Sequence, residues 1–149
     1  MPKKQAPRRV SVLQQHPRKK IPAKRLVPIA RPILDAFNSP IVDLSITLVT
    51  DRQIGALHWE YMGLRGATDI LTFEIPDAKG KVSMAELVIS LDTAARQARE
   101  RGLTLLEEVG MLVVHGLLHL AGLDDTTENA WQKMKWAELT WVTRLCERL

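Results

Sequence analysis

The sequence predicts a single α+β domain in which short strands alternate with helices. Apolar residues recur with a period of two in some segments and with helical spacing in others. No repeat or linker divides the 149 residues. A chain of this length with 46% apolar and 26% charged residues can bury one core of ordinary size.

Four segments have the pattern of strands. In the second of them, Leu44, Ile46 and Leu48 alternate with more polar neighbours, as expected for a strand with one buried face. A turn-rich stretch at residues 76–81 separates the last two strands. We expect the strands at residues 10–14, 44–49, 70–75 and 86–90.

The segments between the strands have helical spacing. The first helix should start near Pro22 and run to about Ala36, and the two prolines inside it can kink or break it. Its expected buried face comprises Leu26, Ile29, Ile33 and Phe37. Asp51 is expected to cap a second helix, which Gly63 ends. Further helices are expected at residues 92–101, 105–120 and 128–149.

The single cysteine, Cys146, cannot form a disulfide within the chain, which indicates a reducing, cytoplasmic setting and no disulfide partner. No stretch approaches the roughly 20 apolar residues needed to cross a bilayer, so no membrane partner is expected. Residues 1–9 have the composition of a flexible basic leader, and residues 10–149 are expected to form one domain.

Basic residues are concentrated near the N-terminus. Residues 1–38 contain ten lysine and arginine residues and one acid, whereas residues 39–149 contain 11 basic and 16 acidic residues. Such a cluster can neutralise nucleic-acid phosphates, although the same charges are typical of a solvated tail and helix face. The candidate RNA contacts are Arg18, Lys19, Lys20, Lys24 and Arg25.

The segment that begins at His115 has the layout of a metal site. Side chains four residues apart project from one face of a helix with about 3.6 residues per turn, so His115 and His119 can bind one ion. Gly122 can end the helix in a left-handed conformation and return an acid to the same point. The spacing resembles that of zincins, but Gly116 stands where their peptidases carry a glutamate as general base.

Two acids, Asp124 and Asp125, compete for the third ligand position, and the spacing favours Asp125. Asp125 can instead form a capping box with Glu128 at the start of the last helix. An aspartate ligand makes a metal-bound water less acidic than three neutral imidazoles do and favours harder metals such as manganese. We expect one Zn²⁺ ion, with another divalent metal as the alternative.

The run from His115 to Asp125, His-Gly-Leu-Leu-His-Leu-Ala-Gly-Leu-Asp-Asp, resembles the signature of the YbeY family of bacterial metal-dependent endoribonucleases. Residues 68–73, Thr-Asp-Ile-Leu-Thr-Phe, are similar to the family's Thr-Asp-Val-Leu-Ser-Phe strand. Residues 86–90 are similar to its Asp-Ile-x-Ile-Ser strand. The order of elements also agrees from about Val10 to the C-terminus.

The resemblance implies an α/β/α-like fold, in which a small mixed four-stranded sheet is packed by helices and one of them is a zincin-like metal helix. It implies zinc bound by His115, His119 and Asp125, the last in place of the family's third histidine. It further implies a single-strand-specific endoribonuclease that matures ribosomal RNA, including the 3' end of 16S rRNA, and serves ribosome quality control with the small ribosomal subunit.

Two positions, Met62 and Asp125, bear on whether the full activity is retained. The family places an arginine where this chain has Met62, so a cation that would hold an RNA phosphate is missing. Arg65 is a candidate substitute, with a solvent-exposed arginine as the alternative. Because Gly116 stands where the helix of a peptidase carries its glutamate, the proton acceptor must be the metal-bound water or a distant acid such as Glu86. For Glu86, a structural role at a strand start is the alternative.

Two other functions stay open. The chain can be a ribosome-assembly factor with weak or lost nuclease activity, a reading that Met62 and Asp125 favour. It can also be a metal-dependent hydrolase of another substrate. The absent helix glutamate and the basic N-terminal third count against that alternative.

Overall fold

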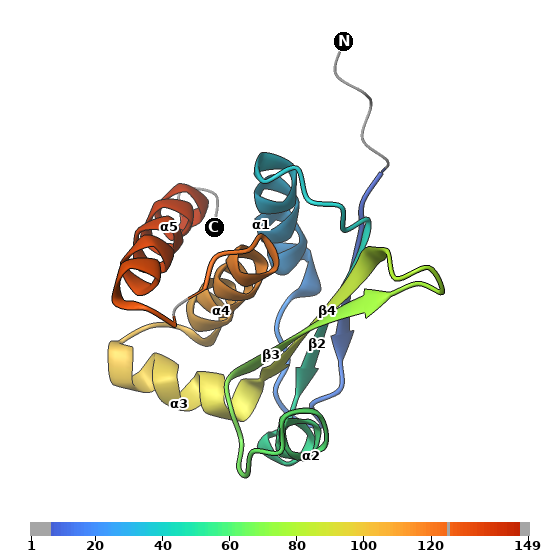
Figure 1. Cartoon of the computed structure of the whole chain (residues 1–149). Helices are drawn as coiled ribbons and strands as arrows, with labels where there is room; N and C mark the ends of the chain where they lie inside the picture. The colour runs from blue at the N-terminus through green and yellow to red at the C-terminus, as the bar shows by residue number, and fades with distance from the viewer. Residues whose placement is uncertain (1–6, 125, 147–149) are drawn as a thin grey trace.

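The computed structural model describes residues 7–124 and 126–146 and confirms the α+β class (Figure 1). In these ranges the chain forms four strands and five helices. In chain order the elements are β1 (Arg9–Gln14), α1 (Ala23–Ala36), β2 (Asp43–Val49), α2 (Asp51–Met62), β3 (Ile70–Pro76), β4 (Val82–Ser90), α3 (Leu91–Arg101), α4 (Leu105–Leu120) and α5 (Glu128–Cys146).

The four strands form one mixed sheet, as the resemblance implies, and their order is β1-β2-β4-β3. β1, β2 and β4 run parallel, whereas β3 pairs antiparallel with β4 and forms an edge of the sheet. β4 begins at Val82, earlier than its sequence pattern predicts, because its first residues pair with the end of β3. The edge position of β3 leaves its outer side available to a site.

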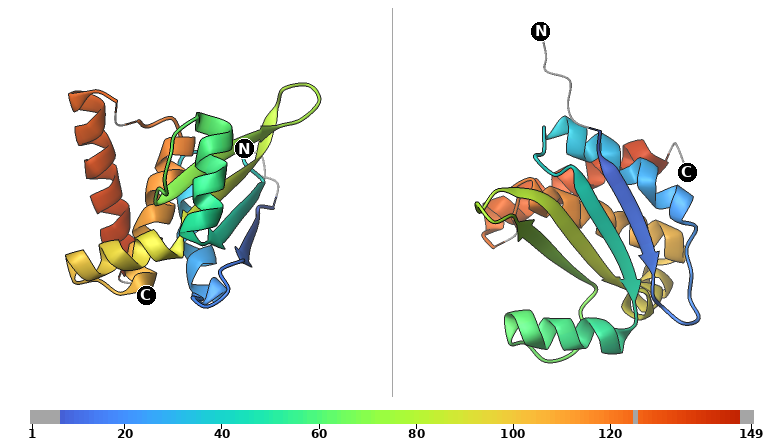
Figure 2. Two further views of the ribbon diagram at one scale, coloured as in Figure 1. Left: turned by 90° about the horizontal axis from the view of Figure 1, so that it is seen from below. Right: turned by 90° about the vertical axis from the view of Figure 1, so that its right-hand side faces the viewer.

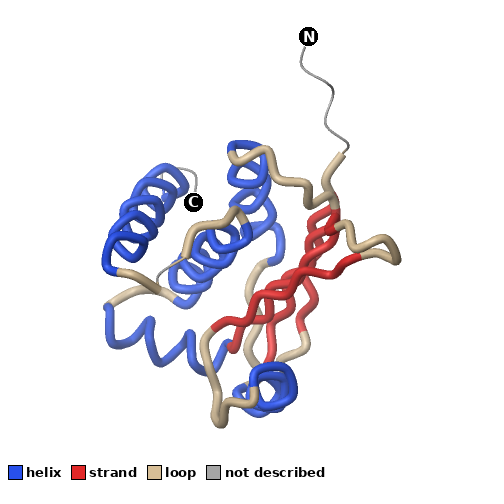
Figure 3. Tube along the Cα trace, viewed as in Figure 1, coloured by secondary structure: helices blue, strands red, loops and turns tan. Residues whose placement is uncertain are grey.

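Helices cover the two faces of the sheet unequally (Figures 1 and 3). On one face α1 and α4 pack over the strands, and α3 and α5 pack against α4. The main core lies here and includes Leu44, Ile46 and Leu48, as their alternation predicts. On the opposite face α2 covers one end of the sheet and leaves the rest without a helix (Figure 2, right).

The buried helix α4 is the centre of the domain, as its apolar sequence predicts. Thr104 and Glu107 form a capping box at its start, and Gly122 adopts a φ of 99° just after its end. None of the described helices is by itself long and apolar enough to cross a membrane, and α3 and α4 meet that test only as a pair bent by 110°.

Gly116 brings α4 close to the sheet. A Cβ at this position would lie 2.9 Å from Ile70 Cδ1 on β3 and 2.9 Å from Leu87 Cδ2 on β4. Only glycine therefore allows this approach without moving both side chains. Gly116 faces the sheet, so the position of a zincin glutamate is here a packing position.

Several end positions differ from the sequence expectation. Thr50, and not Asp51, caps α2: its side chain accepts from the backbone N–H of Gln53 in a capping box. Phe37 is 39% exposed because α1 ends before it. The two internal prolines leave α1 continuous from Ala23 to Ala36.

Arg8 extends the folded part of the chain into the expected leader. Its guanidinium contacts Asp35 Oδ1 at 2.8 Å and donates to the carbonyl oxygens of Ser39, at 2.9 Å, and Ile41. Arg9 is the first residue of β1. Residues 1–6 lie outside the described residues, and a leader there stays a prediction.

A polar network joins the segments that follow β1, β2 and β4. Asp92 accepts hydrogen bonds from His16 Nε2 and Lys19 Nζ, both at 2.8 Å, and from the backbone N–H of Asp51 at 3.0 Å. His16 Nδ1 accepts in turn from the backbone N–H of Lys19 at 2.9 Å. Burial opposes ionisation of Asp92, but these hydrogen bonds hold its pKa well below the ordinary value of 3.8.

Replacing Gly116 by alanine should destabilise the protein. Forced repacking of Ile70 and Leu87 should cost about 1–3 kcal/mol of unfolding free energy, of which alanine's helix propensity returns at most ~1 kcal/mol. Gly110→Ala is the matched control, because a Cβ there lies 3.4 Å from Ile29 Cδ1, an ordinary contact. Urea unfolding should rank Gly110→Ala above Gly116→Ala, and equal stabilities would contradict the packing argument.

Replacing Asp92 by asparagine should cost roughly 1–3 kcal/mol of unfolding free energy at pH 7, because the donors around this partly buried side chain lose one acceptor oxygen and the negative charge. The folded-state pKa lies below the unfolded value of about 3.9, so the stabilisation is complete well above pH 4 and is lost as the pH falls below it. Urea unfolding at pH 7 and pH 3 should therefore show a smaller difference at pH 3. A difference that grows on acidification would contradict this assignment.

Candidate functional site

His115 and His119 lie one turn apart on α4 and line the same cavity, of about 490 Å³. The structure thus brings the two histidines together as their spacing predicts. The side chain of His115 is 31% exposed and His119 is exposed, so the cavity opens to solvent. The other described lining residues come from the end of α2 and from β3 and are Tyr61, Met62, Ile70, Leu71, Thr72 and Phe73.

The wall opposite the histidines is set by the end of α2. Gly63 takes a left-handed conformation with a φ of 64° and stops the helix at Met62, as expected. The rings of Tyr61 and Phe73 meet edge to face, with their centres 5.2 Å apart. Met62 therefore lines the cavity where the resembled family carries an arginine, and the apolar side chain is 58% exposed.

A carboxylate that the sequence analysis missed contacts His115. Glu138 Oε1 on α5 is hydrogen-bonded to His115 Nδ1, and Glu138 Oε2 accepts from Lys135 Nζ at 3.2 Å. The Glu138 side chain is 15% exposed. Burial opposes its ionisation, but the hydrogen bonds and charges of His115 and Lys135 hold the pKa of Glu138 below its ordinary value.

The sequence does contain a signal for Glu138. Met134, Ala137 and Trp141 recur at helical spacing and pack against the core, and Glu138 lies on the same stripe. An acid on an apolar stripe needs a buried polar partner. The histidine motif and its flanking loop do not reach this residue, and only the fold brings α5 beside α4.

Asp125 lies outside the described residues, so its role as the third ligand stays a prediction. The competing role of helix cap is filled by Thr127, whose Oγ1 accepts from the backbone N–H of Ala130 at 3.1 Å. Asp124 Oδ1 accepts from the backbone N–H of Thr126 at 3.2 Å, within the same loop. Among the described residues, no group of three His, Cys, Asp or Glu side chains is placed to hold a metal ion.

The donor chemistry of the cavity fits a divalent transition metal. Zinc accepts neutral imidazole nitrogens, and metal-binding histidines usually donate their other ring N–H to a carboxylate or carbonyl. His115 and Glu138 form such a pair, and His119 supplies a second imidazole on the same cavity. A catalytic zinc site has three protein ligands, and His115 and His119 would provide two of them.

Arg65 and Glu86, the weak catalytic candidates, lie elsewhere. The guanidinium of Arg65 lies 5.6 Å from the ring centre of Trp59, and the residue is exposed. Glu86 points away from α4, because its neighbour Leu87 faces Gly116 and side chains alternate along a strand. Neither is among the described residues that line the histidine cavity.

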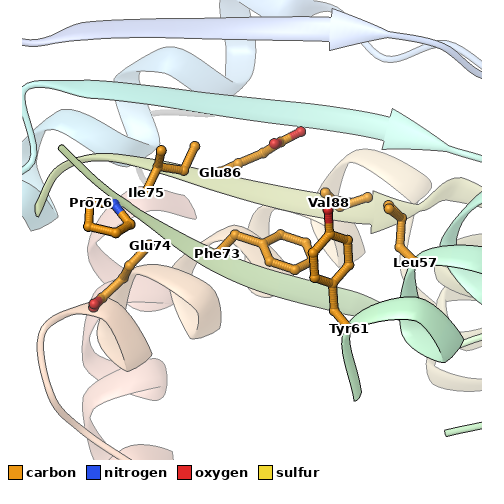
Figure 4. Close-up of a pocket in the computed structure, with 8 residues that line it drawn as sticks. All are labelled: Leu57, Tyr61, Phe73, Glu74, Ile75, Pro76, Glu86 and Val88. Atoms are coloured by element: carbon orange, nitrogen blue, oxygen red, sulfur yellow. The ribbon is translucent and has the colours of Figure 1, made fainter. Parts of the chain in front are cut away.

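Glu86 lines a second cavity, of about 340 Å³, on the sheet face that α2 partly covers (Figure 4). Its Oε1 accepts from Thr47 Oγ1 at 2.8 Å, which supports the structural role. Tyr61 and Phe73 line both cavities. The two cavities thus lie on either side of edge strand β3.

The five candidate RNA contacts lie between β1 and α1 and in the first turn of α1, at the end of the sheet where α2 and α3 begin (Figure 2, left). Lys19 is held by Asp92, whereas Arg18, Lys20, Lys24 and Arg25 are exposed. None of them is among the described residues that line the histidine cavity. A ligand that touches both regions must therefore be extended.

A mixed four-stranded sheet packed by helices, with two histidines on the central helix, defines an α+β class of protein. A model of the family described as Endoribonuclease YbeY matches residues 11–145, and the chain belongs to this family. The solution structure of a Thermotoga maritima protein has the same fold, with a TM-score of 0.62 at 23% identity over 94% of this chain and 91% of that one.

Curated relatives agree with the family. The chain is 40% identical over 116 residues to an Endoribonuclease YbeY from an Anaeromyxobacter species, covering 77% of this chain and 60% of that protein. It is 39% identical over 122 residues to the Thermus thermophilus protein of the same name, covering 77% and 88%. A chloroplastic Endoribonuclease YBEY from Arabidopsis thaliana is 48% identical over 98 residues, which are 63% of this chain and 17% of that protein. The chain thus spans less than two thirds of the length of two of these relatives.

Proposed function

We propose that the protein is a metal-dependent endoribonuclease that cleaves single-stranded RNA in the cytoplasm. The observation that carries the proposal is the pair of His115 and His119 in one open cavity beside edge strand β3, in a chain of the YbeY family. Relatives described as endoribonucleases support the choice of RNA as substrate. The proposal also includes the processing of ribosomal RNA, with the 3' end of 16S rRNA, and ribosome quality control. The proposed partner is the small ribosomal subunit.

His115, His119 and Asp125 would hold one zinc ion or another divalent metal. When bound, such an ion polarises a phosphoryl oxygen and lowers the pKa of a coordinated water. Gly116 leaves α4 without the carboxylate that would accept a proton in a peptidase. A bound ion would therefore supply an acidified water in a cavity that has no carboxylate among its described lining residues.

Other side chains would orient the RNA. Tyr61 is 62% exposed and contacts Phe73, so unstacked bases of a single strand can stack on an aromatic surface at the edge of the cavity. Arg18, Lys19, Lys20, Lys24 and Arg25 would neutralise phosphates farther along the strand. Double-stranded RNA offers neither free bases nor a flexible backbone, which favours single-strand specificity.

The geometry weighs against hydrolysis of another substrate such as a peptide. A glutamate in place of Gly116 would meet Ile70 and Leu87 before its carboxylate could reach the cavity. The assembly-factor alternative with weak nuclease activity rests on a departure of the sequence from the family. Met62 contributes an apolar side chain to the cavity where the family carries a phosphate-binding arginine.

The proposal is tested by bound metal and by cleavage of single-stranded RNA, measured on untagged protein. His119→Ala should abolish stoichiometric metal binding and lower the cleavage rate by at least about 100-fold. Loss of a residue that only hydrogen-bonds to a metal ligand costs up to about 100-fold, and loss of a ligand should cost no less. Asp125→Ala should behave alike if Asp125 is a ligand. His58→Ala is the matched control, because His58 Nδ1 contacts Gly66 O outside the cavity, at 2.9 Å.

Three outcomes would contradict the proposal. Wild-type protein without stoichiometric metal removes the metal centre. Bound metal with no RNA cleavage supports the assembly-factor alternative. Cleavage that persists equally in wild type and His119→Ala places the activity elsewhere.

Restoring a cation at position 62 should increase activity. Met62→Arg adds a positive charge beside the histidines, so the cleavage rate should rise several-fold. The slope of the logarithm of the RNA-binding constant against the logarithm of salt concentration should become steeper by about one released counterion. Met84→Arg is the control, since Met84 is 44% exposed and shares the Glu86 face of β4. Rates and dissociation constants at several salt concentrations are the measurement, and equal gains from both variants would contradict a role of position 62.

A further inference from the structure

We propose that Glu138 is a positioning residue of the metal centre, which holds His115 in the tautomer and orientation that ligation requires. The inference rests on the proposed function, because it assumes that His115 is a ligand. It concerns a residue on α5, outside the histidine motif, whose contact arises from the tertiary fold.

The first step is the burial of Glu138. Its side chain is 15% exposed and lies on the stripe that packs α5 on the core beside Met134, which is 1% exposed. An aliphatic side chain would bury this position at a lower desolvation cost than a carboxylate does. The carboxylate therefore needs a specific partner, and His115 Nδ1 is that partner.

The second step is the chemistry of the imidazole ring. A neutral imidazole carries its proton on one nitrogen and a lone pair on the other. When His115 donates Nδ1–H to Glu138, the lone pair resides on Nε2, the nitrogen left to act as ligand. The carboxylate also makes the ring a better donor and fixes its plane.

The third step is the role of Lys135. Its Nζ donates to Glu138 Oε2 at 3.2 Å, which leaves Oε1 directed at His115. Lys135 is 52% exposed, so this ion pair is screened by solvent and contributes less than the contact with His115. A second imidazole, His119, lines the same cavity from one turn farther along α4.

The experiment uses two variants of Glu138 and one control. Glu138→Met removes the acceptor at similar length, and Glu138→Gln keeps an acceptor oxygen but removes the charge. Glu128→Met, an exposed change on the same helix, is the control. The readouts are the His115 ring nitrogens in metal-free protein, by NMR, and the affinity for Zn²⁺, by competition with a chelator.

In metal-free wild type we expect the Nδ1–H tautomer at His115. Glu138→Met should shift the ring toward the Nε2–H form that free histidine prefers and weaken Zn²⁺ binding by about 10–100-fold. Glu138→Gln should lie between wild type and Glu138→Met, and the control should match wild type. A purely structural role of Glu138 would lower the unfolding midpoint without changing the tautomer.

An unchanged tautomer and unchanged Zn²⁺ affinity in folded Glu138→Met would overturn the inference. The inference would also be overturned if the tautomer depends on Glu138 but the wild-type protein binds no Zn²⁺. In that case the proposed metal centre itself has failed. If the wild-type protein binds Zn²⁺ and Glu138→Met binds it more weakly while the Glu128→Met control does not, the proposed function stays intact. Glu138 is then established as a positioning residue of the metal centre.

Discussion

The close contact of α4 with β3 and β4 at Gly116 determines where the site lies. Because residue 116 has no side chain, the helix rests against Ile70 and Leu87. His115, the preceding residue, is then carried to the edge of the sheet, and His119 follows one turn later. Tyr61 and Met62 complete the cavity only because α2 ends beside the same edge strand. The chemistry of the site thus depends on a packing distance.

Because of the same packing distance, the polar side chains of the site come from two helices. α4 carries both histidines but has no room for an acid at residue 116, which faces the sheet. The carboxylate that orients His115 comes instead from α5, which packs on the other side of α4. A zincin peptidase combines ligands and base on one helix. Here α4 carries the two proposed ligands, and residue 116 between them packs against the sheet instead of supplying a base.

Local sequence signals predicted the parts of the fold that depend on local interactions. The bounds of α4 agree with the expected residues 105–120, and the common cavity of the histidines follows from helical spacing. Glu138 required the packing of α5 on α4, and the early start of β4 required its pairing with β3. Phe37 had helical spacing, yet α1 ended before the face continued. Tertiary contacts decided each of these cases.

Edge strand β3 separates two cavities of different character that share Tyr61 and Phe73. Glu86 lines the cavity on the sheet face, and its carboxylate repels phosphate groups. The other cavity carries histidines and no carboxylate among its described lining residues. If RNA is the substrate, the Glu86 carboxylate disfavours a backbone phosphate in the cavity on the sheet face. Tyr61 and Phe73, which line both cavities, offer the bases of a single strand an aromatic surface on which to stack at the edge of the sheet.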